Sequence, residues 1–124
     1  MTKAEAAKMR KAADFRVKMG IIMQTAWLFV KEEGYSMGEA MHIAYLNYNL
    51  RSMMYKGHVR FVFRKLNGEV REACGTLLSG VFDNAIMGTG HPTPKRNQLY
   101  WDDESNGFRS FRKSRLVSII GLAA

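Results

Sequence analysis

The sequence predicts an α+β fold, with a helical hairpin in its first half and a small antiparallel β-barrel in its second half. Apolar residues recur at helical spacing through the first half, and the period changes to two after residue 57. Turn residues then separate several short strands. We expect a helical segment over residues 1–56 and a barrel over residues 57–124, packed together as one compact unit.

The first predicted helix runs from Lys3 to Glu33. Its segment over residues 1–18 is rich in Ala, Lys and Arg and is expected to be solvated. Gly20 lies inside the apolar pattern and leaves open a break into two helices. The expected core face consists of Phe15, Met19, Ile22, Ala26 and Phe29 or Val30.

A second helix is predicted from Met37 to Met54. Gly34 suits the left-handed residue that ends the first helix, and Ser36 with Glu39 forms a capping-box pattern. The short connection favours an antiparallel pair. The stretch YLNYNLRSMMY is alternatively a partner-binding surface, because Met and Tyr suit adaptable contacts, but core packing is favoured. The expected core face consists of Ala40, Met41, Ala44, Tyr45 and Tyr48.

The stretch VRFVFRKLNGEV predicts a β-hairpin, because apolar and basic residues alternate before a turn. A two-residue turn would place Phe63 opposite Glu72. A three-residue loop with Gly68 in the left-handed position would place Phe61 opposite Ala73, and this register is favoured.

Residues 79–97 are rich in turn residues and predict a long connection. The segment GTGHPTP within it lacks the Lys-Ser/Thr ending of a phosphate loop. A second hairpin is expected to pair residues 99–101 with residues 108–111 across the tip DDESNG, and a last strand is expected over residues 116–120. Short antiparallel strands without room for a second sheet predict a small half-open barrel.

The stretch VRFVFRKLNGEVREACGTL, followed by YWDDESNGFRSFRKSRLVSI, resembles the small Sm-like, SH3-type β-barrel family of unknown function found in gut anaerobes, their phages and mobile elements. The shared pattern is a basic strand, a Gly turn, REA-GT, a loop, aromatic-Asp, and G-aromatic-RSF with a closing Leu. The resemblance covers residues 58–120, and the preceding helices are similar to those of some members. It implies an SH3-like (Sm-like) barrel that carries the helical hairpin, and it implies no catalytic residues.

The composition excludes several classes of protein. The chain of 124 residues has a formal net charge of +8, and such an excess attracts polyanions. Its single cysteine, Cys74, excludes an internal disulfide and favours a cytoplasmic location. The most apolar run, residues 19–30, is too short to span a bilayer, so we expect no membrane span.

No motif predicts a catalytic site. The histidines lie in separate predicted elements without metal-ligand spacing, at His42, His58 and His91. Cys74 has no recognisable base and is expected to be inert. We interpret three adjacent acids as solvated residues of a hairpin tip, namely Asp102, Asp103 and Glu104. We therefore expect a non-enzymatic protein with no metal, no cofactor and no small-molecule substrate.

The remaining candidates for a binding site are basic residues. It comprises Arg60, Arg64, Lys65, Lys95, Arg96, Arg109, Arg112, Lys113 and Arg115. Small barrels bind nucleic acid by combining a cationic rim with exposed rings. Trp101, Phe108 and Phe111 are either such rings or core residues. We expect the cations to face outward as a barrel rim, free of the protein's own carboxylates.

These cations predict an accessory or regulatory protein of a phage or mobile element that binds nucleic acid or a nucleoprotein complex. One alternative is an anti-CRISPR-like, anti-defence inhibitor that binds and blocks a host nuclease complex such as a CRISPR nuclease. Another is a membrane-surface protein that uses the basic first helix.

Overall fold

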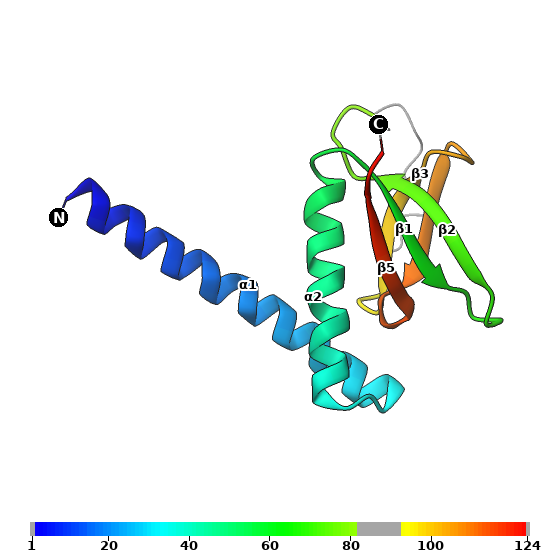
Figure 1. The fold of residues 1–124 in the computed structure, drawn as a ribbon, viewed down its shortest axis with the longest axis horizontal. Coiled ribbons are helices and arrows are strands. Elements are labelled where there is room, and N and C mark those ends of the chain that lie inside the picture. Colours follow the sequence, from blue (N-terminus) through cyan, green and yellow to red (C-terminus); the bar gives the residue numbers. More distant parts are fainter. Residues whose placement is uncertain (1, 82–92, 124) are drawn as a thin grey trace.

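The computed structural model describes residues 2–81 and 93–123. The chain forms three layers, in which helix α1 (Lys3–Glu33) packs on helix α2 (Met37–Met54) and α2 packs on a curled antiparallel sheet (Figure 1). The strands are β1 (His58–Arg64), β2 (Val70–Thr76), β3 (Asn97–Asp102), β4 (Gly107–Arg112) and β5 (Leu116–Leu122), and a short 3-10 helix, η1 (Lys113–Arg115), precedes β5. Their order in the sheet is β4-β3-β2-β1-β5. The predicted order of two helices followed by antiparallel strands is confirmed.

Helix α1 is continuous and begins at a capped end, where the Thr2 Oγ1 accepts a hydrogen bond from the Glu5 N–H at 3.1 Å. The helix passes through Gly20 without interruption, so the alternative of a break there is wrong. Its first half projects beyond α2 (Figure 1). Phe15 therefore lies outside the region that α2 covers, and 61% of its surface is exposed. Its predicted place in the core is wrong for that reason.

The two helices join through the predicted turn. Gly34 has a left-handed φ of 70°, and the Ser36 Oγ accepts a hydrogen bond from the Glu39 N–H at 3.2 Å. The two helices pack against each other on both sides of this turn. The α1 side chains of Ile22, Ala26 and Phe29 are buried against Ala40 and Ala44 of α2, and the predicted Met and Tyr side chains of α2 pack around them. The favoured core packing of this face is confirmed.

The hairpin of β1 and β2 has the predicted register, with Phe61 opposite Ala73. Lys65 and Glu69 close a three-residue loop through a hydrogen bond of 2.7 Å from the Lys65 N–H to the Glu69 carbonyl. Gly68 in this loop has a φ of 91°, which a residue with a Cβ rarely adopts. The loop length therefore decides which side chains of β1 face the interior.

The hairpin of β3 and β4 and the last strand are also confirmed. Leu99 pairs with Ser110, and β5 extends two residues beyond its predicted end while pairing with β1. Strand β3 meets β2 at only two positions, Gly75 with Asp102 and Thr76 with Trp101. The middle of the predicted connection over residues 79–97, with His91 and most of GTGHPTP, lies outside the described residues.

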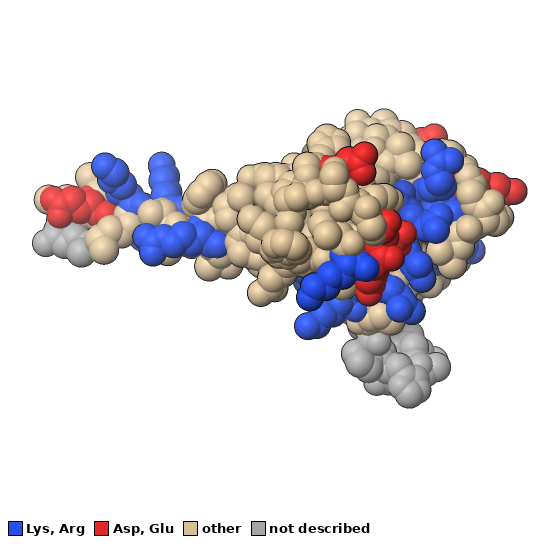
Figure 2. Space-filling model, turned by 90° about the horizontal axis from the view of Figure 1, so that it is seen from below, with Lys and Arg blue, Asp and Glu red and all other residues tan. Residues whose placement is uncertain are grey.

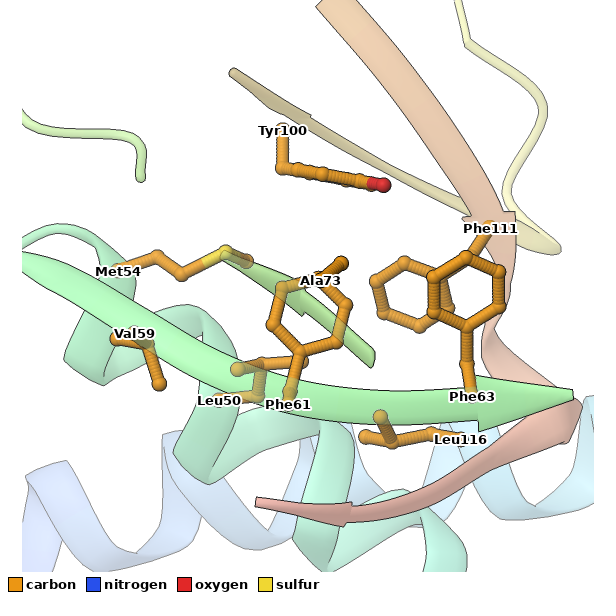
Figure 3. Packing of buried hydrophobic residues seen from close by; sticks show 9 residues of the cluster. All are labelled: Leu50, Met54, Val59, Phe61, Phe63, Ala73, Tyr100, Phe111 and Leu116. Carbon is orange, nitrogen blue, oxygen red and sulfur yellow. The ribbon is translucent and has the colours of Figure 1, made fainter. Parts of the chain in front are cut away.

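The barrel interior is an aromatic cluster that α2 covers on one side (Figure 3). Phe61 meets Tyr100 edge to face at 5.2 Å, and the ring of Phe63 stacks on that of Phe111 at 5.3 Å. Leu50 and Met54 of α2 belong to the same cluster. Helix α2 is therefore part of the barrel core as well as of the helix core. Burial of each ring of the cluster stabilises the fold by about 1.5–3 kcal/mol relative to an exposed ring.

Within residues 2–81 and 93–123, no helix combines the length and the hydropathy that crossing a bilayer requires.

Candidate functional site

Five of the nine predicted cations line one pocket of about 370 Å³ at the end of the barrel. We call it the basic pocket, and its cations are Arg64, Lys65, Arg96, Arg112 and Arg115. They come from the end of β1 and its loop, from the residue before β3, from the end of β4 and from η1. The fold thus gathers cations from three separate segments of the chain.

The strand alternation explains why rings form the floor of the basic pocket and cations its rim. Phe63 and Phe111 point into the barrel and are only 7% and 3% exposed, while their neighbours Arg64 and Arg112 point outward. Figure 3 shows the two rings together at one end of the core. Buried rings offer no face for a base to stack on, so this pocket presents charge above an apolar floor.

The positive charges of the basic pocket are only partly balanced by nearby carboxylates. Two of its cations have long ion pairs of 3.8 Å, from Arg112 to Glu33 and from Lys65 to Glu69, whereas a direct charged hydrogen bond is about 2.8 Å. The other three, Arg64, Arg96 and Arg115, have no carboxylate at ion-pair distance among the described residues.

Protein carbonyls hold two of these unpaired cations in place. The Arg64 Nη1 donates to the Gly68 carbonyl and the Arg115 Nη1 to the Lys65 carbonyl, each at 3.3 Å. The Arg115 Nε is buried without a hydrogen-bond partner in the described part of the chain. Neutral acceptors therefore position both guanidinium groups, and no carboxylate of the described residues forms an ion pair with either.

Lys and Arg gather at the barrel end of the face shown in Figure 2, with a few Asp and Glu among them. A second group lies along the projecting part of α1. On this face, the basic side chains therefore fall into two groups.

The predicted rim is not continuous, because Arg109 forms an ion pair with a carboxylate of the protein. Its Nε lies 3.2 Å from the Asp102 Oδ2, and Arg71 approaches the same oxygen at 3.2 Å. Asp102 is fully buried, so its interpretation as a solvated tip residue is wrong. It follows Tyr100 by two positions in β3 and therefore shares the inward face of that strand, a signal that the sequence already contained.

The other three predicted cations lie away from the basic pocket. Arg60 forms a 3.8 Å ion pair with Glu72 across the outer face of the first hairpin, where both side chains are about half exposed. Lys95 and Lys113 line a different cavity, between the helices and the barrel. The expectation that all nine cations are free of carboxylates is wrong for four: Arg60, Lys65, Arg109 and Arg112.

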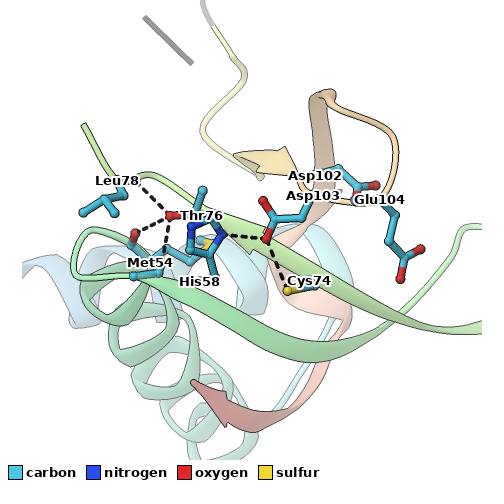
Figure 4. A network of polar contacts seen from close by, with 9 residues as sticks. Met54, His58, Cys74, Thr76, Leu78, Asp102, Asp103 and Glu104 are labelled. Carbon is cyan, nitrogen blue, oxygen red and sulfur yellow. Dashed lines mark hydrogen bonds and ion pairs between the residues drawn. The ribbon is translucent and has the colours of Figure 1, made fainter. Parts of the chain in front are cut away.

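A polar cluster that the sequence reasoning missed joins His58, Cys74 and Asp103 (Figure 4). The Asp103 Oδ2 lies 2.7 Å from the His58 Nδ1 and accepts a hydrogen bond from the Cys74 Sγ at 3.3 Å. Burial, and then the neighbouring Asp103, raises the pKa of Cys74 to about 11. The thiol therefore stays protonated at neutral pH.

The three acids predicted at the hairpin tip differ in their exposure. Like Asp102, Asp103 is not a solvated tip residue, whereas Glu104 is exposed as predicted.

The aromatic residues near the carboxyl end divide between the two predicted alternatives. Phe111 is a core residue. Trp101 and Phe108 are partly exposed and meet edge to face at 5.2 Å. Among the residues that the structure describes, no group of three His, Cys, Asp or Glu side chains is arranged to hold a metal ion.

A family model described as WYL_2, Sm-like SH3 beta-barrel fold, matches residues 47–117, which is more than half of the chain. The match begins within α2 at Asn47, whose Nδ2 donates to the Lys113 carbonyl at 2.8 Å and so ties the helix to η1. It ends in β5. No curated protein and no solved structure matches the chain. The fold implied by the sequence motifs is confirmed.

Proposed function

The chain belongs to the WYL_2 family of Sm-like SH3 β-barrels, and from this premise we propose that it binds nucleic acid through the basic pocket. The observation that carries the proposal is the convergence of Arg64, Arg96 and Arg115 on one concave surface, with no carboxylate at ion-pair distance among the described residues. Guanidinium groups match the geometry of phosphate oxygens and stay charged at every physiological pH.

The ligand is recognised through its phosphates. The floor rings are buried, so the cations of the rim are the main groups that contact it, and phosphate contacts carry no sequence information. We therefore expect binding that depends weakly on base sequence and strongly on salt. A concave pocket suits a strand that can bend into it, so single strands are expected to bind more tightly than duplexes.

The proposed role is non-enzymatic and accessory. The high pKa of Cys74 supports this, because a protonated thiol is a poor nucleophile. The association with phages and mobile elements rests on the resemblance of the motifs. Inhibition of a host nuclease complex stays a prediction that no feature of the described residues favours over nucleic-acid binding.

Fluorescence anisotropy with labelled single-stranded oligonucleotides tests the proposal. If three to five cations contact phosphates, affinity should fall by about 20- to 100-fold between 50 and 200 mM salt. The double variant Arg64→Gln/Arg96→Gln removes two exposed cations and should lower the slope of log affinity against log salt by about 1.4.

The matched control is Arg10→Gln/Arg16→Gln, which removes two exposed cations from the projecting part of α1. It should leave the slope unchanged. Equal losses in both double variants, or an affinity independent of salt, would contradict binding at the basic pocket.

A further inference from the structure

A second concave region lies between α1, α2 and the start of the β3–β4 hairpin. It consists of an inner pocket of about 300 Å³ and an adjoining outer pocket of about 730 Å³. The two share Ile21, Thr25 and Lys113, and we call them together the helix–barrel groove. The groove shares no lining residue with the basic pocket, so it is a separate site.

The helix–barrel groove is cationic. Its charged lining residues are Lys31, Arg51, Lys95 and Lys113, and none of its lining residues is acidic. Lys113 is partly buried and has no carboxylate at ion-pair distance among the described residues. Burial, and then the nearby charge of Arg51, lowers the pKa of Lys113. An anion in the groove would stabilise the positive charge of the Lys113 ammonium group.

Asn47 lines the inner pocket and joins α2 to η1 there. Its side chain is 6% exposed, and its Nδ2 donates to the Ile43 carbonyl at 2.9 Å and to the Lys113 carbonyl at 2.8 Å. These two bonds fix the orientation of the amide, because a flipped amide would turn its oxygen toward two carbonyls. The Oδ1 is left buried without a donor in the described residues, which is rare in folded proteins.

The walls of the groove are apolar and aromatic. Ile21 on α1, Tyr48 on α2 and Tyr55 just after α2 line the inner pocket, and Trp27 lines the outer one. Trp27 and Tyr55 are 50% and 54% exposed. Small-ligand sites combine such walls with a few polar groups, and an inner pocket of about 300 Å³ lies at the lower end of their range.

We propose that the helix–barrel groove binds a small aromatic anion, meaning a planar ring that carries a phosphate or carboxylate group. Lys113 and Arg51 bind the anionic group, and Tyr48 and Tyr55 contact the ring. This proposal concerns a different site from nucleic-acid binding at the basic pocket. Each of the two proposals can therefore fail without affecting the other.

The fluorescence of Trp27 reports on the groove directly. The chain has two tryptophans, so Trp101→Phe leaves Trp27 as the only one. This variant is titrated with adenosine and uridine monophosphates, with 4-hydroxybenzoate and indole-3-carboxylate, and with inorganic phosphate. We expect a saturable change with a nucleotide or with an aromatic carboxylate, and the responding class identifies the source of the anion. Inorganic phosphate should give no such change over the same range.

Lys113→Met in the same background should weaken this binding roughly tenfold or more, because a charge-assisted contact is lost. Arg51→Gln changes an exposed residue and should weaken binding in the same direction. Lys65→Met is the matched control, a partly buried lysine of the basic pocket, and should leave the affinity unchanged. Thermal unfolding by circular dichroism verifies that each variant is folded.

The proposal is overturned if neither class of aromatic anion saturates the signal at millimolar concentration. It is also overturned if inorganic phosphate competes as well as the aromatic anions, or if Lys65→Met lowers the affinity as much as Lys113→Met.

Discussion

Individual carboxylates determine which arginines of the barrel are available to a ligand. Asp102 is fully buried and forms ion pairs with Arg71 and Arg109, although Arg109 is about half exposed. Arg64 and Arg96 are exposed and lie beyond ion-pair reach of every described carboxylate. The position of the acid, rather than the exposure of the base, therefore distinguishes the cations that can bind phosphate from those that stabilise the fold.

The single thiol gives a direct test of the polar cluster around Asp103. A thiol with a pKa of about 11 rather than 9.0 forms about 100-fold less thiolate at pH 8. Alkylation of native Cys74 by iodoacetamide, followed by mass spectrometry, should therefore be at least about 100-fold slower than alkylation of the denatured chain. Asp103→Asn removes a neighbouring negative charge and should speed the native reaction. Equal rates for native and denatured wild-type chains would contradict the buried, protonated thiol.

The secondary structure elements were predictable where local chemistry determines them. Gly68 and the length of its loop were sufficient to place Phe61 opposite Ala73, because a hairpin loop fixes the register of its strands. The ends of α2 likewise followed from the pattern after Gly34. Both predictions depend only on residues close together in the sequence.

Predictions that depended on a partner element were less successful. Phe15 continues the apolar spacing of α1, but whether it is buried depends on how far α2 extends beside it. Asp102 was read as part of a turn because it is followed by two further acids, yet β3 extends to it and turns it inward. Periodicity identifies a face of an element but does not identify what covers that face.

Alanine substitutions at two glycines are expected to change the free energy of unfolding in opposite directions. A Cβ at Gly75 in β2 would overlap the Tyr100 ring and approach the Trp101 carbonyl oxygen at 3.2 Å. Gly75→Ala should therefore lower the free energy of unfolding by about 1–3 kcal/mol. A Cβ at Gly20 in α1 meets nothing within 4 Å, so Gly20→Ala should raise it by up to about 1 kcal/mol.

Urea denaturation measures both glycine variants against the wild type. A stabilising Gly75→Ala would contradict the close packing of β2 on β3. A strongly destabilising Gly20→Ala would contradict the open surroundings of α1 at that position.

In the complete fold, α2 connects the two halves of the molecule. One of its faces packs on α1, while Leu50 and Met54 enter the barrel core. Asn47 bonds to the Lys113 carbonyl, and the Lys113 N–H bonds to the Arg96 carbonyl at 2.8 Å. This chain of bonds runs from the helix to the residue before β3 and fixes η1 between the two concave sites.

The candidate site was only partly predictable, because it depends on this assembly. The sequence identified the basic residues by type and by their places on strands. It did not indicate that Arg64 and Arg96 would meet at one pocket, or that Lys113 would line another. Residues that lie far apart in the chain are brought together by the curl of the sheet, and no local pattern specifies that curl.

The most direct test of nucleic-acid binding at the basic pocket is an NMR titration of the isotope-labelled protein with a short single-stranded oligonucleotide. We expect the largest amide shift changes at Arg64, Lys65 and Arg96 and along η1, with little change over residues 3–18 despite their six basic side chains. Shift changes concentrated on those amino-terminal residues, with none around the basic pocket, would contradict the proposed site.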